Sequence, residues 1–165
     1  MDKRLVLIAT MFMASTGLAS EPAFVIGDSN PGLAEGARQL IAGHDEKGIE
    51  LTLLGLQAAN GKREEAIALS NLCAGYTNLR DYETALKYCD ILLTRNDKSW
   101  RAYNSKALIY IDTKQYDKAE SALLKGEAIN PLARSMKIAR ALFLDATQPV
   151  VPEIEIDDRQ KFEKQ

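Results

Sequence analysis

The chain has 165 residues, of which 46% are hydrophobic and 27% are charged, with ten Gly, five Pro and two Cys. These proportions are typical of one globular domain and exclude a chain that is disordered throughout. The net charge of −2, with no basic block, argues against nucleic-acid binding. Because His and Cys are scarce and there is no Gly-rich phosphate loop, the sequence predicts no catalysis, no cofactor and no metal site.

Residues 1–19 have the layout of a secretory signal peptide. Two basic residues precede an apolar run from Leu5 to Met13, and Gly17-Leu18-Ala19 fits the small-x-small cleavage pattern. The alternative, an N-terminal membrane anchor, would need a longer apolar segment to cross about 30 Å of hydrocarbon. We therefore expect cleavage after Ala19, a mature form with no membrane span, and a periplasmic or secreted protein. Residues 20–30 follow as a loose leader.

Residues 31–61 are predicted to form a helical pair. The first helix is expected over residues 32–42 and the second over residues 45–59, closed by the turn Asn60-Gly61. The glycines within this stretch lower its helix propensity by about 1 kcal/mol each relative to Ala.

An internal repeat comes next, in units that cover residues 62–98 and 99–132. In each unit apolar residues recur at three- and four-residue steps on two segments joined by a polar turn, which indicates two amphipathic helices. Laying the chain against itself at an offset of 34 aligns Tyr76 with Tyr110, Tyr82 with Tyr116, Ala85 with Ala119, and Cys73 with Ala107.

Both units resemble the tetratricopeptide repeat (TPR), a helix-turn-helix whose period equals this offset. The family pattern has a small residue and an aromatic on the first helix, an aromatic at the turn, an Ala early on the second helix and a final Pro, which Pro131 supplies in the second unit. The resemblance implies an all-α, TPR-like helix-turn-helix solenoid, an α-α superhelix. At the same phase residues 31–61 hold Gln39 and Ala42 in the small and aromatic slots, so we interpret them as a degenerate repeat.

Two segments follow the repeats. Residues 147–165 contain Pro149, Pro152 and an acidic run, and are predicted to be a disordered acidic tail. The alternative for the tail is that the alternating residues 153–156 add a strand to the sheet edge of a partner. Before it, residues 133–146 are predicted to form a capping helix with an apolar face made of Ile138, Ala141, Leu142 and Leu144.

Cys73 and Cys89 are the most informative pair of side chains. Cys73 occupies the small-residue slot of a first helix, and Cys89 lies on the partner helix where it packs back against that slot. The two thiols should therefore face each other and form a disulfide in an oxidising compartment. The alternative is a pair of buried free thiols that only fill space.

The remaining candidate residues are interpreted as structural. His44 beside Asp45 and Glu46 marks a turn or helix start, because consecutive helical residues do not converge on a metal. Trp100 and the six Tyr occupy repeat positions and are expected to pack rather than to hold a cofactor.

The resemblance also implies a binding groove, because first helices in the TPR family line a concave side whose outward residues bind a peptide. Only one of the implied residues is cationic, so the subclass that clamps a C-terminal carboxylate is not expected. The alternative is a plain solvated face, which would leave several apolar side chains exposed. Carried over residue by residue, the groove comprises Ile67, Ser70, Asn71, Ala74, Asn78, Arg101, Asn104, Ser105, Leu108, Asp112, Ser135, Ile138 and Leu142.

Together these observations predict a non-enzymatic interaction module, an adaptor or scaffold that binds a protein or peptide partner in the groove. One alternative is a self-associating structural scaffold, a homo-oligomer in which end helices stack between copies. Another is an accessory subunit of a periplasmic or secreted enzyme complex. A hydrolase would need a converging set of catalytic side chains, and the sequence offers a single His.

Overall fold

The computed structural model describes residues 30–148, and the predicted signal peptide, most of the leader and most of the acidic tail lie outside this range. The described part is all-helical and contains no strand, which confirms the predicted all-α class. Its seven helices are α1 (Pro31–Ile41), α2 (Asp45–Gln57), α3 (Lys62–Asn78), α4 (Tyr82–Arg95), α5 (Trp100–Asp112), α6 (Tyr116–Ile129) and α7 (Arg134–Thr147).

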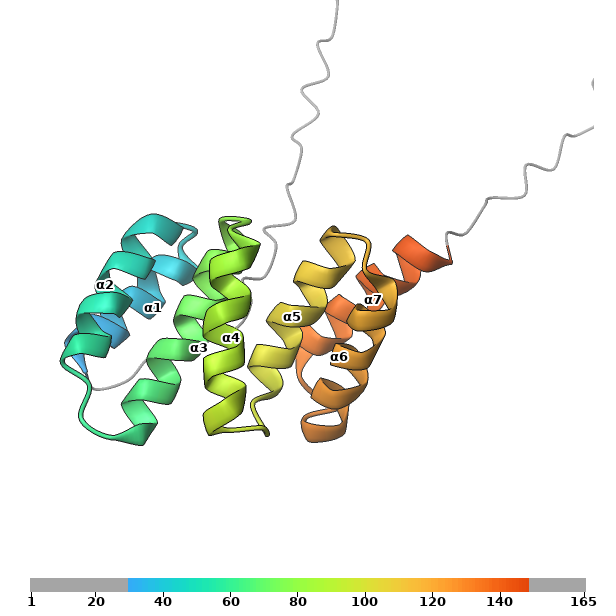
Figure 1. The fold of residues 1–165 in the computed structure, drawn as a ribbon. Coiled ribbons are helices and arrows are strands. Elements are labelled where there is room, and N and C mark those ends of the chain that lie inside the picture. The colour runs from blue at the N-terminus through green and yellow to red at the C-terminus, as the bar shows by residue number, and fades with distance from the viewer. Residues whose placement is uncertain (1–29, 149–165) are drawn as a thin grey trace, which may run out of the picture.

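The helices are arranged as three consecutive hairpins followed by α7. The pairs α1–α2, α3–α4 and α5–α6 make the densest contacts, and each first helix also touches the next first helix along the row α1, α3, α5, α7. Figure 1 shows α2, α4 and α6 toward the viewer, with α1 and α7 behind them. Each first helix in the middle of the row is therefore covered from several sides.

The three hairpin turns share one backbone geometry. Gly43, Arg80 and Lys114 have φ angles of 79°, 60° and 58°, and each lies two residues before a second helix begins. The next residue donates its backbone N–H to the carbonyl five residues earlier, as in Asp81 to Tyr76 at 3.0 Å. This is the Schellman arrangement, in which one left-handed residue satisfies the last carbonyls of a helix.

The positions of the turns show that the repeat register predicted for residues 31–61 was wrong by three residues. Arg80 and Lys114 are separated by one full repeat period, but Gly43 lies three positions further from Arg80 than that period allows. In this register Gly36, rather than Gln39, takes the small slot of the first helix, and Gly48 takes the slot of Ala85 and Ala119. The first pair thus has small residues on both helices. The offset that aligns the two repeats does not align these glycines with the small residues of the repeats.

The small slots are where the two helices of a pair come closest. Ala85 and Ala119 are fully buried. A Cβ atom added at Gly36 would lie 3.0 Å from the carbonyl oxygen of Gly48, and one added at Gly48 would lie 2.6 Å from Cγ of Leu40. The α1 and α2 backbones can approach this closely only because neither glycine carries a side chain.

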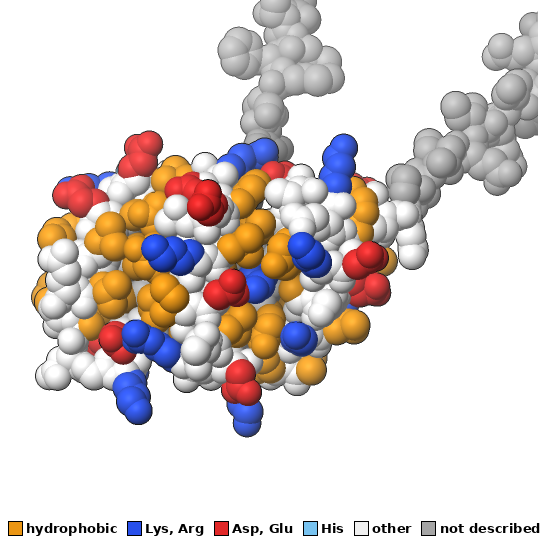
Figure 2. Space-filling view, viewed as in Figure 1, with side chains coloured by type: hydrophobic (Ala, Val, Ile, Leu, Met, Phe, Trp, Pro, Cys, Tyr) orange, Lys and Arg blue, Asp and Glu red, His pale blue; other side chains and the backbone are white. Residues whose placement is uncertain are grey.

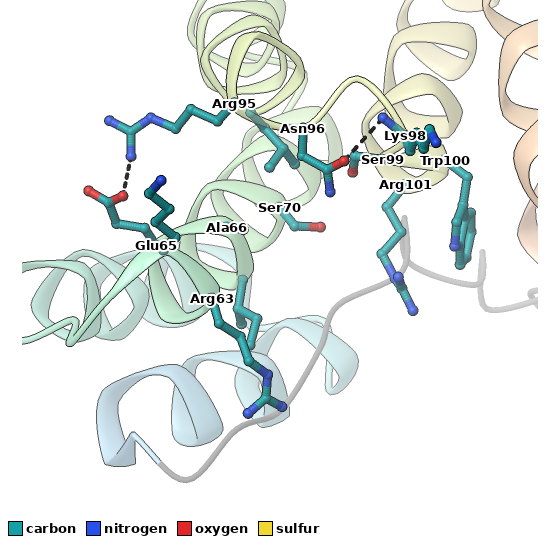
Figure 3. Close-up of a pocket in the computed structure, with 13 residues that line it drawn as sticks. Arg63, Glu65, Ala66, Ser70, Arg95, Asn96, Lys98, Ser99, Trp100 and Arg101 are labelled. Carbon is teal, nitrogen blue, oxygen red and sulfur yellow. Dashed lines mark hydrogen bonds and ion pairs between the residues drawn. The ribbon is translucent and has the colours of Figure 1, made fainter.

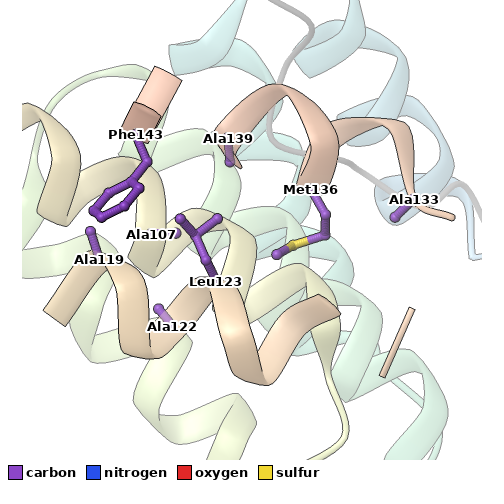
Figure 4. Close-up of a cluster of buried hydrophobic side chains, with 8 residues drawn as sticks. All are labelled: Ala107, Ala119, Ala122, Leu123, Ala133, Met136, Ala139 and Phe143. Atoms are coloured by element: carbon purple, nitrogen blue, oxygen red, sulfur yellow. The ribbon is translucent and has the colours of Figure 1, made fainter. Parts of the chain in front are cut away.

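The core at the C-terminal end lies between α5, α6 and α7 (Figure 4). The predicted apolar face of α7 was wrong in its register, because Met136, Ala139 and Phe143 are the buried residues, whereas Leu142 and Leu144 are 47% and 43% exposed. The residues that the structure buries recur at spacings of three and four along the helix, so they form one stripe against α6.

Replacing Gly48 with Ala should destabilise the fold, because overpacking a close helix contact typically costs about 1–3 kcal/mol, which exceeds the gain in helix propensity of about 1 kcal/mol. Gly126→Ala is the matched control: its added Cβ would meet mainly the flexible end of Met136, at 2.6 Å from Cε. Urea unfolding followed by circular dichroism should give a lower midpoint for Gly48→Ala than for Gly126→Ala. The reverse order would contradict the close-contact assignment.

Candidate functional site

A pocket of about 810 Å³ lies where the start of α3 meets the connection between α4 and α5. Figure 3 shows the side chains that line it, which come from α3, from α4 and from the connection that leads into α5. α3 contributes residues from its first three turns, α4 contributes Leu92 and Arg95, and the connection with the first turn of α5 contributes Asn96 and residues 98–101. The pocket is therefore formed between two hairpins and not within one.

The charged side chains that line the pocket are mainly cationic. Five of its thirteen lining residues are cationic, and one, Glu65, is acidic. Glu65 forms an ion pair with Arg95 (Figure 3). The five cationic residues, called the basic rim below, are Lys62, Arg63, Arg95, Lys98 and Arg101.

The start of α5 adds to this positive potential. Its first turn contains no acidic residue, and Ser99 at its N-cap makes no side-chain capping bond among the residues that the structure describes. The partial positive charge of the helix N-terminus is thus left facing the pocket region. The guanidinium carbon of Arg101 lies 4.3 Å from the centroid of the Trp100 ring, and burial lowers the pKa of this guanidinium below its ordinary value.

The floor of the pocket combines apolar surface with one hydroxyl. Ile67 and Leu92 contribute the apolar part. Ser70 is 5% exposed, and within residues 30–148 its Oγ has no hydrogen-bond partner. A buried hydroxyl without a partner is energetically unfavourable, at about 1–3 kcal/mol. This hydroxyl is available to a ligand that enters the pocket.

Three of the thirteen predicted groove residues meet at this pocket, namely Ile67, Ser70 and Arg101. Four others were expected to face outward, but the structure buries them. The physical reason is that α3 and α5 each contact neighbouring helices on more than one side, so their outward positions are covered. These four buried residues are Asn71, Ala74, Asn104 and Ser105.

Two more predicted groove residues connect neighbouring hairpins. Asn78 donates a hydrogen bond to Asp45 at 2.8 Å. Asp112 accepts a hydrogen bond from Tyr82 and lies 3.4 Å from the guanidinium of Arg80. Burial, followed by this hydrogen bond, raises the pKa of Tyr82 to about 12. These side chains are engaged in holding α2 to α3 and α4 to α5.

The last four predicted groove residues lie further along the row of helices. Leu108 is half-buried and packs against two core clusters. Ser135 and Ile138 are half-buried on α7, and Leu142 on the same helix is exposed. They do not line the pocket.

Most of the basic rim is not predicted from the sequence. Arg101 is the one member among the predicted groove residues, because the family resemblance implies only the outward faces of the first helices. The other four lie at the start of α3, at the end of α4 and in the following connection. The sequence does contain a signal for these residues, since Lys62 and Arg63 begin the first repeat and Arg95 and Lys98 end it.

Cys73 and Cys89 face each other, as predicted. Their sulfurs lie at disulfide distance with the Cα atoms 5.1 Å apart, and both residues are buried between α3 and α4. His44 is exposed at the start of α2, with its Nδ1 2.8 Å from Oε1 of Gln39. In the part of the chain that the structure describes, no group of three or more His, Cys, Asp or Glu residues is placed to hold a metal.

No family model, curated protein or solved structure matches this chain. None of the helices between residues 30 and 148 combines the length and the apolar character needed to cross a bilayer.

Reduction should destabilise the protein, because a bridge that closes a loop of about 15 residues contributes about 3 kcal/mol in the chain-entropy model. Thermal melts with and without reductant measure this difference, and intact mass after alkylation reports the state of the thiols. The double variant Cys73→Ala/Cys89→Ala controls for other effects of the reductant, since its melting temperature should not respond. Full alkylation of an exported sample without reductant would show that the thiols are free.

Proposed function

We propose that this chain is a TPR-like helical solenoid that acts as a non-enzymatic interaction module for a protein partner. The repeated geometry supports the architecture: the turn residues Arg80 and Lys114 are one repeat period apart, and so are the C-caps Asn96 and Asn130. Each hairpin covers one face of the next, and α7 covers the last. Such stacking is how repeat proteins bury a continuous core.

The pocket between α3, α4 and α5 is the observation that carries the binding function. It offers the basic rim to carboxylates, Ile67 and Leu92 to apolar side chains, and the Ser70 hydroxyl to a peptide backbone. This combination suits an extended peptide that carries acidic and apolar residues. In this proposal the module is exported to the periplasm or secreted, where the Cys73–Cys89 pair would be oxidised.

Self-association is a second candidate, because the C-terminal end exposes apolar surface. Leu132 is 80% exposed and Leu124 is 58% exposed, in addition to the exposed leucines of α7. By contrast, the face seen in Figure 2 mixes apolar side chains with charges of both signs. Two copies could therefore bury the α6–α7 end against each other. Size-exclusion mass across a concentration series distinguishes this candidate from a monomeric adaptor.

Reversing charge on the basic rim should abolish partner capture if the pocket is the binding site. The test is a crosslinking pulldown from the native extract with the mature protein and its Lys62→Glu/Lys98→Glu variant. Both lysines are exposed, so the fold should tolerate the change, and an unchanged circular dichroism spectrum would confirm this. The substitutions place two negative charges beside the acidic residues of the partner, and this repulsion should weaken binding by about 2 kcal/mol, or roughly 30-fold.

The matched control is Lys87→Glu/Lys137→Glu, which makes the same charge change at exposed positions of α4 and α7 outside the pocket. It should retain every partner. Equal recovery of all partners by the pocket variant and by this control would remove the pocket as the binding site.

A further inference from the structure

We propose that the pocket between α3, α4 and α5 is the docking site for the chain's own residues 20–29, the segment that directly precedes α1. This inference goes beyond the proposed function, because it identifies an intramolecular ligand with which an outside peptide would compete. It rests on where the chain enters the fold, on the length and chemistry of the segment, and on the chemistry of the pocket.

The entry point is fixed by Asn30, which is 9% exposed. Its Oδ1 caps α1 by accepting the backbone N–H groups of Gly32 and Leu33 at 3.1 and 3.3 Å. Its Nδ2 donates to the carbonyl of Gly55 at 3.2 Å and to Oε2 of Glu64 at 3.0 Å. Asn30 is thus held against the first turn of α3, where the neighbours of Glu64 on both sides line the pocket.

The segment is long enough to cross the pocket from this point. Ten residues in extended form reach about 33 Å, whereas the pocket extends only from the first turns of α3 to the first turn of α5. A segment that is joined covalently to the chain beside its site has an effective concentration there in the millimolar range. The covalent connection therefore favours the leader over a free peptide of equal intrinsic affinity.

The composition of the segment matches the pocket. Its sequence, SEPAFVIGDS, carries two carboxylates, Glu21 and Asp28, no cationic side chain, and an apolar centre at Phe24, Val25 and Ile26. Cleavage before Ser20 adds one α-amino group at the end of the segment furthest from Asn30. The pocket presents the basic rim around apolar floor residues and the buried Ser70 hydroxyl, which has no partner within the described range. Charge complementarity and apolar burial thus favour the same occupant.

The order of residues is also compatible with docking. Asp28 is two residues from Asn30, so it falls within reach of the cations at the start of α3, Lys62 and Arg63. The apolar centre comes next, in the direction of Leu92 and Trp100. Glu21 would then reach the far side of the basic rim, and the Ser70 hydroxyl would hydrogen-bond to the extended backbone between the two ends.

Zero-length carbodiimide crosslinking of the chain that begins at Ser20 tests this docking directly, because the reagent joins a carboxylate to an amine only when the two are in contact. We expect Asp28 or Glu21 to be linked to Lys62 or Lys98 in peptide mass spectra. The pair Lys106 and Asp90, whose charged atoms lie 2.5 Å apart on different helices, is the internal positive control. Recovery of the control without any leader link would overturn the proposal.

Trp100 gives a second readout, because it is the only tryptophan of the chain and it lines the pocket. Phe24→Ser/Ile26→Ser should raise the acrylamide quenching constant of Trp100 about two-fold by freeing the pocket. The matched control is Ile156→Ser/Phe162→Ser, which removes apolar side chains from the tail instead. An increase in the tail variant alone, or links from the pocket lysines to tail carboxylates alone, would assign the pocket to the tail and overturn the proposal.

Both measurements are made without any partner, so they are independent of the pulldown. Loss of partner capture in the pocket variant together with absent leader links would support the adaptor function and reject the leader as occupant. Leader links together with unchanged partner capture would support the leader as occupant and would reject the pocket as the site that binds the partner.

Discussion

The structure depends on the close approach of two helix backbones within each hairpin. In the first pair Gly36 and Gly48 allow this approach, and in the third pair Ala107 and Ala119 do so. The middle pair has Ala85 on the second helix, and Cys73 on the first helix is joined to Cys89 across the interface. Since each hairpin packs against the next, this spacing also sets the distance between the start of α3 and the start of α5. The dimensions of the pocket follow from it.

Much of the fold could be predicted from the repeat alone. The repeat offset aligned Tyr82 with Tyr116, and both residues begin their helices. It also aligned Cys73 with a small residue, which led to the expectation that Cys73 faces Cys89. Local patterns are informative here because the residues of one hairpin interact mainly with each other, and such contacts are short-range in sequence.

The faces of the helices could not be predicted in the same way. Ten of the seventeen residues of α3 are buried, so no single stripe of this helix distinguishes the core from the binding surface. Polar residues such as Asn71 lie inside because neighbouring helices cover them. The cations of the basic rim lie on three helices, α3, α4 and α5, and on the connection between α4 and α5, and only the stacking of the hairpins brings them together. A sequence pattern reports periodicity within an element, but it does not report the contacts between elements.

The position of the cysteine pair has a consequence for how stability is distributed along the chain. In a linear array each unit is stabilised only through its neighbours, so folding can begin in one unit and spread outward. The covalent link lies in the central hairpin, α3–α4, on which α2 packs from one side and α5 from the other. The link restricts the unfolded chain only within the central hairpin, so its stabilising effect reaches the two ends of the array through the packing of α2 and α5 against that hairpin.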